Sequence, residues 1–323
     1  MRNRKFIDRK EFQAQLEDAC RTSLDANAGL FGPDSVTWRL MRESVGFFGA
    51  GRAVLLQVAH PWVAHGIDQH SRTKRDPLGR FRGTFINVFT FLFGSIDQVH
   101  RLAGELYLTH AAVHGRVTED TGGFLAGSRY SANEISAMLW VHATLWETAI
   151  KMYEEILGPL DAETKEAYYQ EIKRFAYCFG VPESEQPKTW RDFLAYNQQM
   201  WDSDELAVRK VGREVAGFLF DFDLFPGSRL ALHEIRLITA EMMPPRLRTE
   251  FGLGEPTAYT RANYAAAVAA ARAVYPHLPA HIRFLPPYFE ALDRLAGKPH
   301  SGKVTQTLNR VWIGRPELVS AAV

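Results

Sequence analysis

Histidines are the residues of this 323-residue chain whose spacing could support chemistry. His110 and His114 lie four positions apart in LYLTHAAVHGRV, a run that is predicted to be helical, and residues four apart share one helix face. Three more, His60, His65 and His70, follow one another at five-residue intervals upstream. These imidazoles could bind a metal or a cofactor, or they could be ordinary helix residues, so the sequence must first be searched for known kinds of site.

Several common catalytic sites are absent from the sequence. The metalloprotease string His-Glu-x-x-His does not occur, nor does the Glu-x-x-His string of ferritin-like di-iron sites. The chain also lacks the Gly-x-Ser-x-Gly elbow of hydrolases, and its glycine-rich pieces fall short of nucleotide-binding fingerprints. Cys178 lies in the apolar helix end FAYCFG, which predicts a buried, inert thiol.

Composition narrows the class of protein further. The chain is 46% hydrophobic and 23% charged, as expected of a globular protein. Its net charge of +1 does not suggest a nucleic-acid partner. With only two cysteines and no apolar stretch after the basic start, we expect a reduced, cytoplasmic protein.

The longest apolar runs, INVFTFLFG and VAGFLFDFDLF, are too short to span a bilayer. GTFINVFTFLFG is apolar on almost every side, which predicts a fully buried helix. Core packing is the simplest reading of both runs, although peripheral contact with a membrane or a pocket for an apolar ligand stays open.

Helical patterns dominate the chain, and strand-like alternation is nearly absent. We therefore expect an all-α fold built as one large helical bundle domain. Three helix starts carry N-cap signals: Ser95, Ser131 (with Glu134 as a capping box) and Thr189. Another helix is expected to start at Asp161, with Asp161 and Glu163 near its positive N-terminal dipole. Three later helices are predicted over 205–220, 228–243 and 258–275.

A haem site is compatible with these residues. It needs a histidine on a buried helix, an apolar slot and cationic groups for the propionates. His110 is followed by two alanines, which would let a flat macrocycle approach, and Arg80 and Arg82 precede a very apolar helix. A helical bundle whose histidines are simply hydrogen-bonded fits the same residues, so both readings stay open at this point.

Several short segments are informative when they are considered together with their order along the chain. LLQVAHPWVAHGIDQHS, DPLGRFRGT, FGS, THAAVHG and YSANEISAMLWVHATLWET follow one another, and YYQEIKRFAYCFGVP and MMPPRLRTEFGL come later. This series resembles the catalytic domain of the rubber oxygenase (latex clearing protein) family, which includes the fungal endoplasmic-reticulum oxygenase of mycophenolic acid biosynthesis. The resemblance spans 35–295, with 1–34 as an N-terminal extension and 296–323 as a C-terminal tail.

The resemblance implies an all-helical, globin-like core that encloses one haem b. Characterised members use dioxygen to cleave a carbon–carbon double bond of an isoprenoid chain. Their proximal iron ligand lies in the pattern His-x-x-Val-x-Gly, which His110 matches here, with His114 one turn away as the competing ligand. The family's catalytic Arg-x-x-x-Thr pair corresponds to Arg80 and Thr84, which would also contact the haem, and His142 of WVHATL would support the pocket.

Other positions leave alternatives. His60 is either a helix C-cap or a haem-pocket residue, and His70 either lines the pocket or organises its loop. Gly83 stands where the rubber-cleaving enzymes have a lysine, so Lys74 or Arg82 would have to replace that group at the distal side.

We expect a haem-dependent oxygenase that acts with dioxygen on a small isoprenoid- or lipid-like molecule. The alternatives are a haem enzyme of another type, a peroxygenase or dehydratase, and a haem-free protein that binds a hydrophobic ligand.

Overall fold

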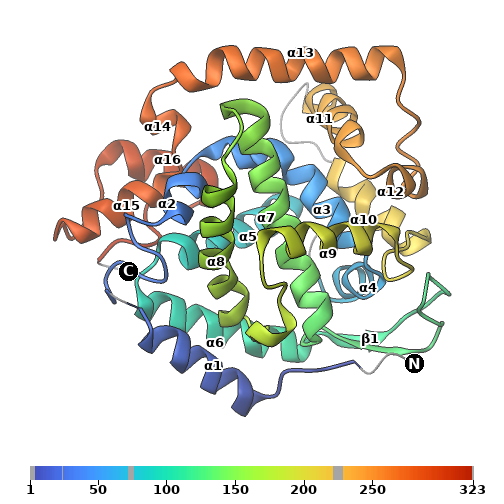
Figure 1. Ribbon diagram of the computed structural model, residues 1–323, viewed down its shortest axis with the longest axis horizontal. Coiled ribbons are helices and arrows are strands. Elements are labelled where there is room, and N and C mark those ends of the chain that lie inside the picture. Colours follow the sequence, from blue (N-terminus) through green and yellow to red (C-terminus); the bar gives the residue numbers. More distant parts are fainter. Residues whose placement is uncertain (1–3, 24, 72–75, 221–227, 322–323) are drawn as a thin grey trace.

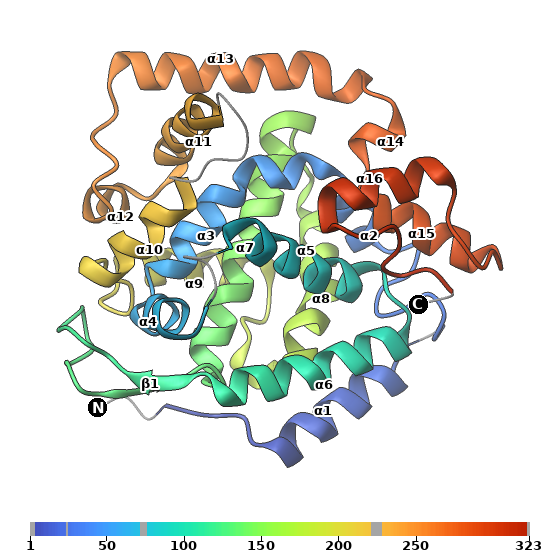
Figure 2. The same cartoon turned by 180° about the vertical axis from the view of Figure 1, so that it is seen from behind.

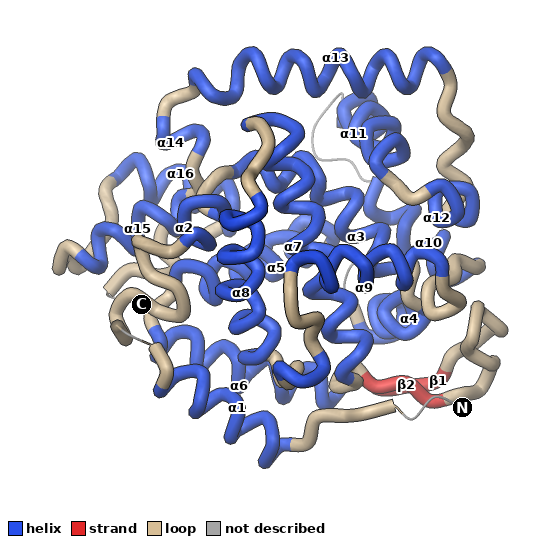
Figure 3. Tube along the Cα trace, in the orientation of Figure 1, coloured by secondary structure: helices blue, strands red, loops and turns tan. Residues whose placement is uncertain are grey.

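The computed structural model describes residues 4–23, 25–71, 76–220 and 228–321. Helices make up most of it, which confirms the predicted all-α fold (Figure 3). The α-helices are α1 (Arg9–Arg21), α2 (Val36–Met41), α3 (Ala50–Val58), α4 (Pro61–His70), α5 (Pro77–Phe93), α6 (Ile96–Ala112), α7 (Ile135–Leu157), α8 (Ala162–Cys178), α9 (Trp190–Asp202), α10 (Lys210–Phe220), α11 (Ser228–Met242), α12 (Pro245–Glu250), α13 (Ala258–Val274), α14 (Ala280–Arg283), α15 (Pro286–Leu295) and α16 (Lys303–Ile313). Short 3-10 helices lie at Ser44–Gly49, Glu183–Glu185 and Tyr275–His277.

Helix α7 passes through the middle of the molecule and packs against α3, α8 and α9 (Figure 1). Its apolar residues recur at helical spacing, and Trp140 and Trp146 are fully enclosed. The Trp140 indole donates to the Leu56 carbonyl oxygen over 2.8 Å, which ties α7 to α3. The predicted capping box was wrong, because Ser131 lies in a strand and the carboxylate of Glu134 is itself the N-cap, accepting from the Ala137 amide.

Helix α6 lies below α5 when the molecule is seen from behind (Figure 2). The predicted N-cap Ser95 is confirmed, and Gln98 completes a capping box with it. The helix ends at Ala112 instead of running on to residue 117, because the next residues pair with a distant segment. Strand β1 (His114–Arg116) runs antiparallel to β2 (Arg129–Ser131), with His114 opposite Ser131.

The remaining sequence predictions agree with the structure to within a few residues. Thr189 is confirmed as an N-cap, and the helix expected from Asp161 is α8, of which Asp161 is the N-cap. The helices predicted over 228–243 and 258–275 correspond to α11 and α13. The helix predicted over 205–220 begins later, at Lys210. Residues 205–209 form a loop instead, which is held by hydrogen bonds from Arg246.

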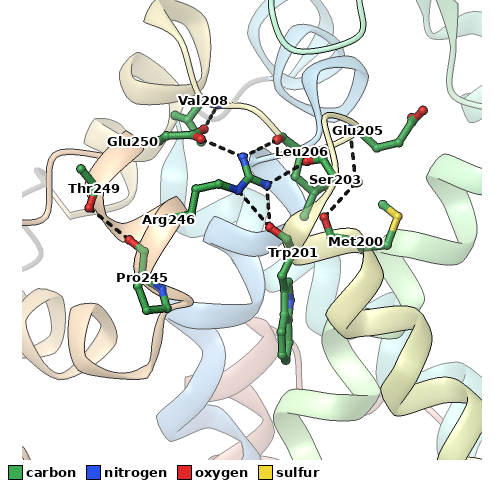
Figure 4. Close-up of polar contacts among 10 residues, drawn as sticks. All are labelled: Met200, Trp201, Ser203, Glu205, Leu206, Val208, Pro245, Arg246, Thr249 and Glu250. Carbon is green, nitrogen blue, oxygen red and sulfur yellow. Dashed lines mark hydrogen bonds and ion pairs between the residues drawn. The ribbon is translucent and has the colours of Figure 1, made fainter.

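Arg246 of α12 holds this loop in place (Figure 4). Its guanidinium donates to the carbonyl oxygens of Trp201, Ser203 and Leu206 at 2.6–3.0 Å, and to Glu250 at 2.7 Å. A planar group with five donors suits several acceptors at once. This cluster fixes the connection between α9 and α10 against α12.

In the described part of the chain, no helix is both long enough and apolar enough to cross a membrane.

Candidate active site

Helix α5 presents the predicted Arg80 and Thr84 on one face. The helix starts at Asp76, whose side chain accepts from the Gly79 amide. One turn later the Arg80 guanidinium donates to the Thr84 hydroxyl over 2.6 Å, and that hydroxyl donates to the Arg80 carbonyl oxygen over 3.1 Å. The i, i+4 spacing therefore gives a preformed pair in which Thr84 orients the cation.

His110 lies in the last turn of α6, and its ring makes no hydrogen bond with any described residue. Its aromatic neighbour is Phe179, at 6.2 Å between ring centroids. Burial lowers the pKa of His110 to about 4, and the positive charge of Arg80 adds to the effect. The imidazole is therefore neutral at pH 7 and keeps a free lone pair, which is the form that binds a metal.

His142 of α7 is buried next to this group. Its ring packs against Trp146, Phe175 and Phe179, with centroids 4.6 Å apart in the last case. Burial, with a smaller contribution from His110, lowers its pKa to about 3. The Nδ1 atom is buried without a partner among the described residues, which is unusual for a buried polar group.

Arg80, Thr84, His110 and Phe179 form one group of neighbouring side chains. The Arg80 side chain is exposed, donates to Thr84, and its positive charge acts on His110, whose ring lies 6.2 Å from that of Phe179. We call these four residues, with the partly exposed face of α5 beside them, the His110 recess.

The first half of α5 supports this description. Residues 81–88 make more than two helical turns and are all partly exposed, although half of them are apolar. A methyl group added at Gly83 would meet no other segment within 4 Å. The predicted fully buried helix is thus buried only in its second half, at residues 89–93. Two open surface pockets lie elsewhere, at the N-terminus of α7 and beside α13.

His60 and His65 are held away from the recess by structural hydrogen bonds. His60 is the N-cap of α4, where Nδ1 accepts from the Trp62 amide over 3.2 Å, so it caps the helix that follows and is not a C-cap. His65 donates from Nδ1 to the Pro61 carbonyl oxygen, and its Nε2 accepts from the Thr118 amide. Both ring nitrogens of His65 are thus engaged, and the Nδ1 of His60 is taken up by its cap.

His70 and His114 meet at the start of the small sheet. The Nε2 atom of His70 lies 3.1 Å from the carbonyl oxygen of His114. Because His114 belongs to β1, it does not share a helix face with His110, contrary to the predicted i, i+4 pair. Lys74 falls outside the described residues, and Arg82 lies against Gly314 at the end of α16.

The sequence reasoning missed the aromatic wall of the recess. Phe179 follows α8 directly, stacks on Phe175 at 5.4 Å and packs against Phe91 at 4.6 Å. FAYCFG carried this signal, but it was interpreted only as a helix end around a thiol. That thiol, Cys178, is buried, and burial raises its pKa, as predicted for an inert cysteine.

Within the described ranges, no group of three or more His, Cys, Asp or Glu side chains could hold a metal ion. A haem differs from such a site because the porphyrin supplies most ligands and the protein needs to supply only an axial one.

Comparison with known proteins adds a family model, described as the catalytic domain of ER-bound oxygenase mpaB/B' and rubber oxygenase, which matches residues 38–273. An uncharacterised protein of Mycobacterium bovis and another of Mycobacterium tuberculosis are each 27% identical over 175 residues, which is 52% of this chain and 65% of theirs. The matched stretch thus spans just under two thirds of each relative. No solved structure matches significantly.

Proposed function

The chain belongs to the ER-bound oxygenase mpaB/B' and rubber oxygenase catalytic-domain family, as its motifs predicted, and from this premise we propose that it is a haem b-dependent oxygenase. The family is one of oxygenase catalytic domains, which implies dioxygen and a small-molecule substrate. The proposed substrate is a hydrophobic, isoprenoid- or lipid-like molecule, and the proposed reaction is oxidative cleavage of a carbon–carbon double bond.

The observation that carries the proposal is the free, neutral imidazole of His110. Its ring makes no hydrogen bond with a described residue, and its lowered pKa keeps the lone pair available at pH 7. Beside it, the buried Nδ1 of His142 has no partner among the described residues, and a buried polar group without a partner suggests a ligand. The residues present therefore fit a haem, which His110 would hold through its iron.

Bound haem would supply the centre at which dioxygen is activated toward a double bond. The chain's own residues would bind the cofactor and orient the substrate. The Arg80 guanidinium, held by Thr84, would neutralise a carboxylate of the cofactor or steady a polar group beside it. Phe179 and its aromatic neighbours would exclude water and hold an alkene by buried apolar area.

Other residues of the recess shape it further. His142 would support the pocket through its free Nδ1 rather than as an iron ligand. Gly83 leaves space where the rubber-cleaving enzymes have a lysine, so we propose that no side chain at this position would contact the bound group. The two cysteines are free thiols, which supports a reduced setting such as the cytoplasm.

Absorption spectra of the purified protein, expressed with full haem supply, test the proposal. We expect a Soret band in the wild type, loss of most bound haem in His110→Ala, and full retention in the matched control His114→Ala. Because His114 lies in β1, its loss should leave the recess intact. Full haem in His110→Ala would place the ligand elsewhere.

The reaction type needs separate assays. Oxygen uptake with an apolar alkene is the expected result, whereas dependence on hydrogen peroxide would indicate a peroxygenase, and loss of water a dehydratase. A colourless wild-type protein would favour the haem-free, ligand-binding alternative.

A further inference from the structure

Helix α16 packs against α15 and against α5, the helix that carries Arg80 and Thr84 (Figure 2). It lies beyond residue 273, where the match to the family model ends, so the comparison assigns no role to its residues. The contacts between α16 and α5 are therefore informative about this chain in particular.

Two buried side chains of α15 hold the end of the chain in place. The Glu290 carboxylate accepts from the Leu318 and Val319 amides, each over 2.7 Å. Asn309 of α16 donates to the same carboxylate. The Arg294 guanidinium donates over 2.8 Å to the carbonyl oxygen of the last residue of α5. Because Glu290 and Arg294 are buried, α16 has a fixed position against α5.

Trp312 of α16 belongs to an aromatic cluster. Its ring lies 4.7 Å from that of Phe47, 5.9 Å from that of Phe85 and 6.5 Å from that of Phe89, measured between centroids. Phe47 in turn meets Phe85 edge to face at 4.9 Å. Of these four rings only that of Phe89 is fully buried, and the other three stay partly exposed although they pack on one another.

One stripe of α5 connects this cluster to the His110 recess. Residues three and four apart share a helix face, and four partly exposed residues of α5 have this spacing: Phe81, Thr84, Phe85 and Val88. Thr84 holds the Arg80 guanidinium at the recess, and the next residue, Phe85, contacts Trp312. The stripe therefore leads from the recess to the aromatic cluster.

An apolar chain laid along this stripe would meet the indole of Trp312 at its far end. Partly exposed apolar side chains that lie next to one another suit the carbon chain of a hydrophobic ligand, because covering them removes apolar surface from water. A large ring that is held by a fixed helix can set the length of such a chain. A small side chain at the same position would leave space for several further carbon atoms.

We propose that Trp312 is a specificity-determining residue, which ends the apolar stripe and limits the length of the isoprenoid chain that binds there. This inference rests on the proposed function for its substrate class, because it concerns the same recess. A tryptophan that only packs α16 onto α5 would behave differently. Its removal would lower stability, and the preferred chain length would not change.

Competitive binding measures that preference. The purified protein is incubated without oxygen with equal amounts of farnesol and of geranylgeraniol, which is one isoprene unit longer. After gel filtration, the bound alcohols are quantified by gas chromatography. We expect Trp312→Ala to raise the bound ratio of geranylgeraniol to farnesol about tenfold over the wild type, because the space left by the indole accepts the extra unit. Trp312→Phe, which keeps a ring there, should stay near the wild-type ratio.

The matched control is Val311→Ala, since Val311 is the neighbouring residue of α16 and is 69% exposed. It should keep the wild-type ratio, and circular dichroism should show that all variants are folded. If Trp312→Ala does not fold, Trp312→Leu takes its place with the same expectation of a raised ratio. An unchanged ratio in the folded variant, or no binding of either alcohol by the wild type, would overturn the inference.

The assay needs neither bound haem nor turnover. A raised ratio in a protein without a Soret band would support the role of Trp312 although the proposed haem oxygenase had failed. An unchanged ratio in a protein with a Soret band would overturn the role of Trp312 and leave the oxygenase proposal standing.

Discussion

His60 makes the stability of the protein sensitive to acid. Its ring is 1% exposed, it packs against the Phe124 ring at 5.4 Å between centroids, and its Nδ1 accepts from the Trp62 amide. Burial lowers the pKa of this imidazole to about 3, and the positive charge of Arg4 contributes further. A charged His60 would lose its capping bond, because a protonated Nδ1 cannot accept.

The sign and size of the effect follow from proton linkage. The pKa is about 6.5 in the unfolded chain and about 3 in the fold, so the unfolded state binds more protons between these values. Stability is therefore complete above pH 6.5 and falls as the pH falls below it. Between pH 7 and pH 5, this single group should lower the free energy of unfolding by about 2 kcal/mol.

The variant His60→Asn isolates this contribution. Asparagine is a good N-cap, so its side-chain oxygen can accept from the Trp62 amide, while its side chain does not titrate in this range. The smaller side chain should lower stability at pH 7 by about 1–2 kcal/mol through lost packing. Between pH 7 and pH 5, however, the variant should lose about 2 kcal/mol less than the wild type.

Urea unfolding of both proteins at pH 7 and pH 5 measures these differences, with His277→Asn as a control for removing an exposed histidine. Equal losses on acidification in wild type and His60→Asn would refute the reasoning, since His60 would then take up a proton without unfolding.

Two further substitutions test how the helices are joined. Gly29 has φ +87°, and an added Cβ would lie 1.9 Å from the Gly94 carbonyl oxygen, so Gly29→Ala should lower the unfolding free energy by about 3–4 kcal/mol. The control Gly252→Ala, at φ +67° with free space around it, should cost only about 1 kcal/mol in urea unfolding, and equal effects would contradict the steric argument. Arg52 is buried, donates to Thr148 over 2.6 Å and pairs with Glu147, so Arg52→Met should cost about 3–5 kcal/mol by leaving that carboxylate unpaired. Adding Glu147→Gln should recover part of this loss in a double-mutant cycle, and strict additivity would show that the pair is not coupled.

The sequence determined the helices and many of their ends. Ser95 and Thr189 could be identified as N-caps because a cap depends on an acceptor and an amide three residues later. The family motifs likewise predicted the oxygenase class and selected Arg80 and His110 as site residues. Information of this kind is local, or it lies in the order of short segments along the chain.

The tertiary structure decided which histidines meet. LYLTHAAVHGRV has no local signal that stops the helix at Ala112. The chain turns there because Val113 and Val117 exchange backbone hydrogen bonds with 127–132, and that pairing moves His114 off the helix. In the same way, Phe179, the residue after α8, reaches His110 of α6, and Asn263 of α13 donates to Glu234 of α11. Contacts between segments far apart in sequence leave no periodic pattern, so only the folded chain reveals them.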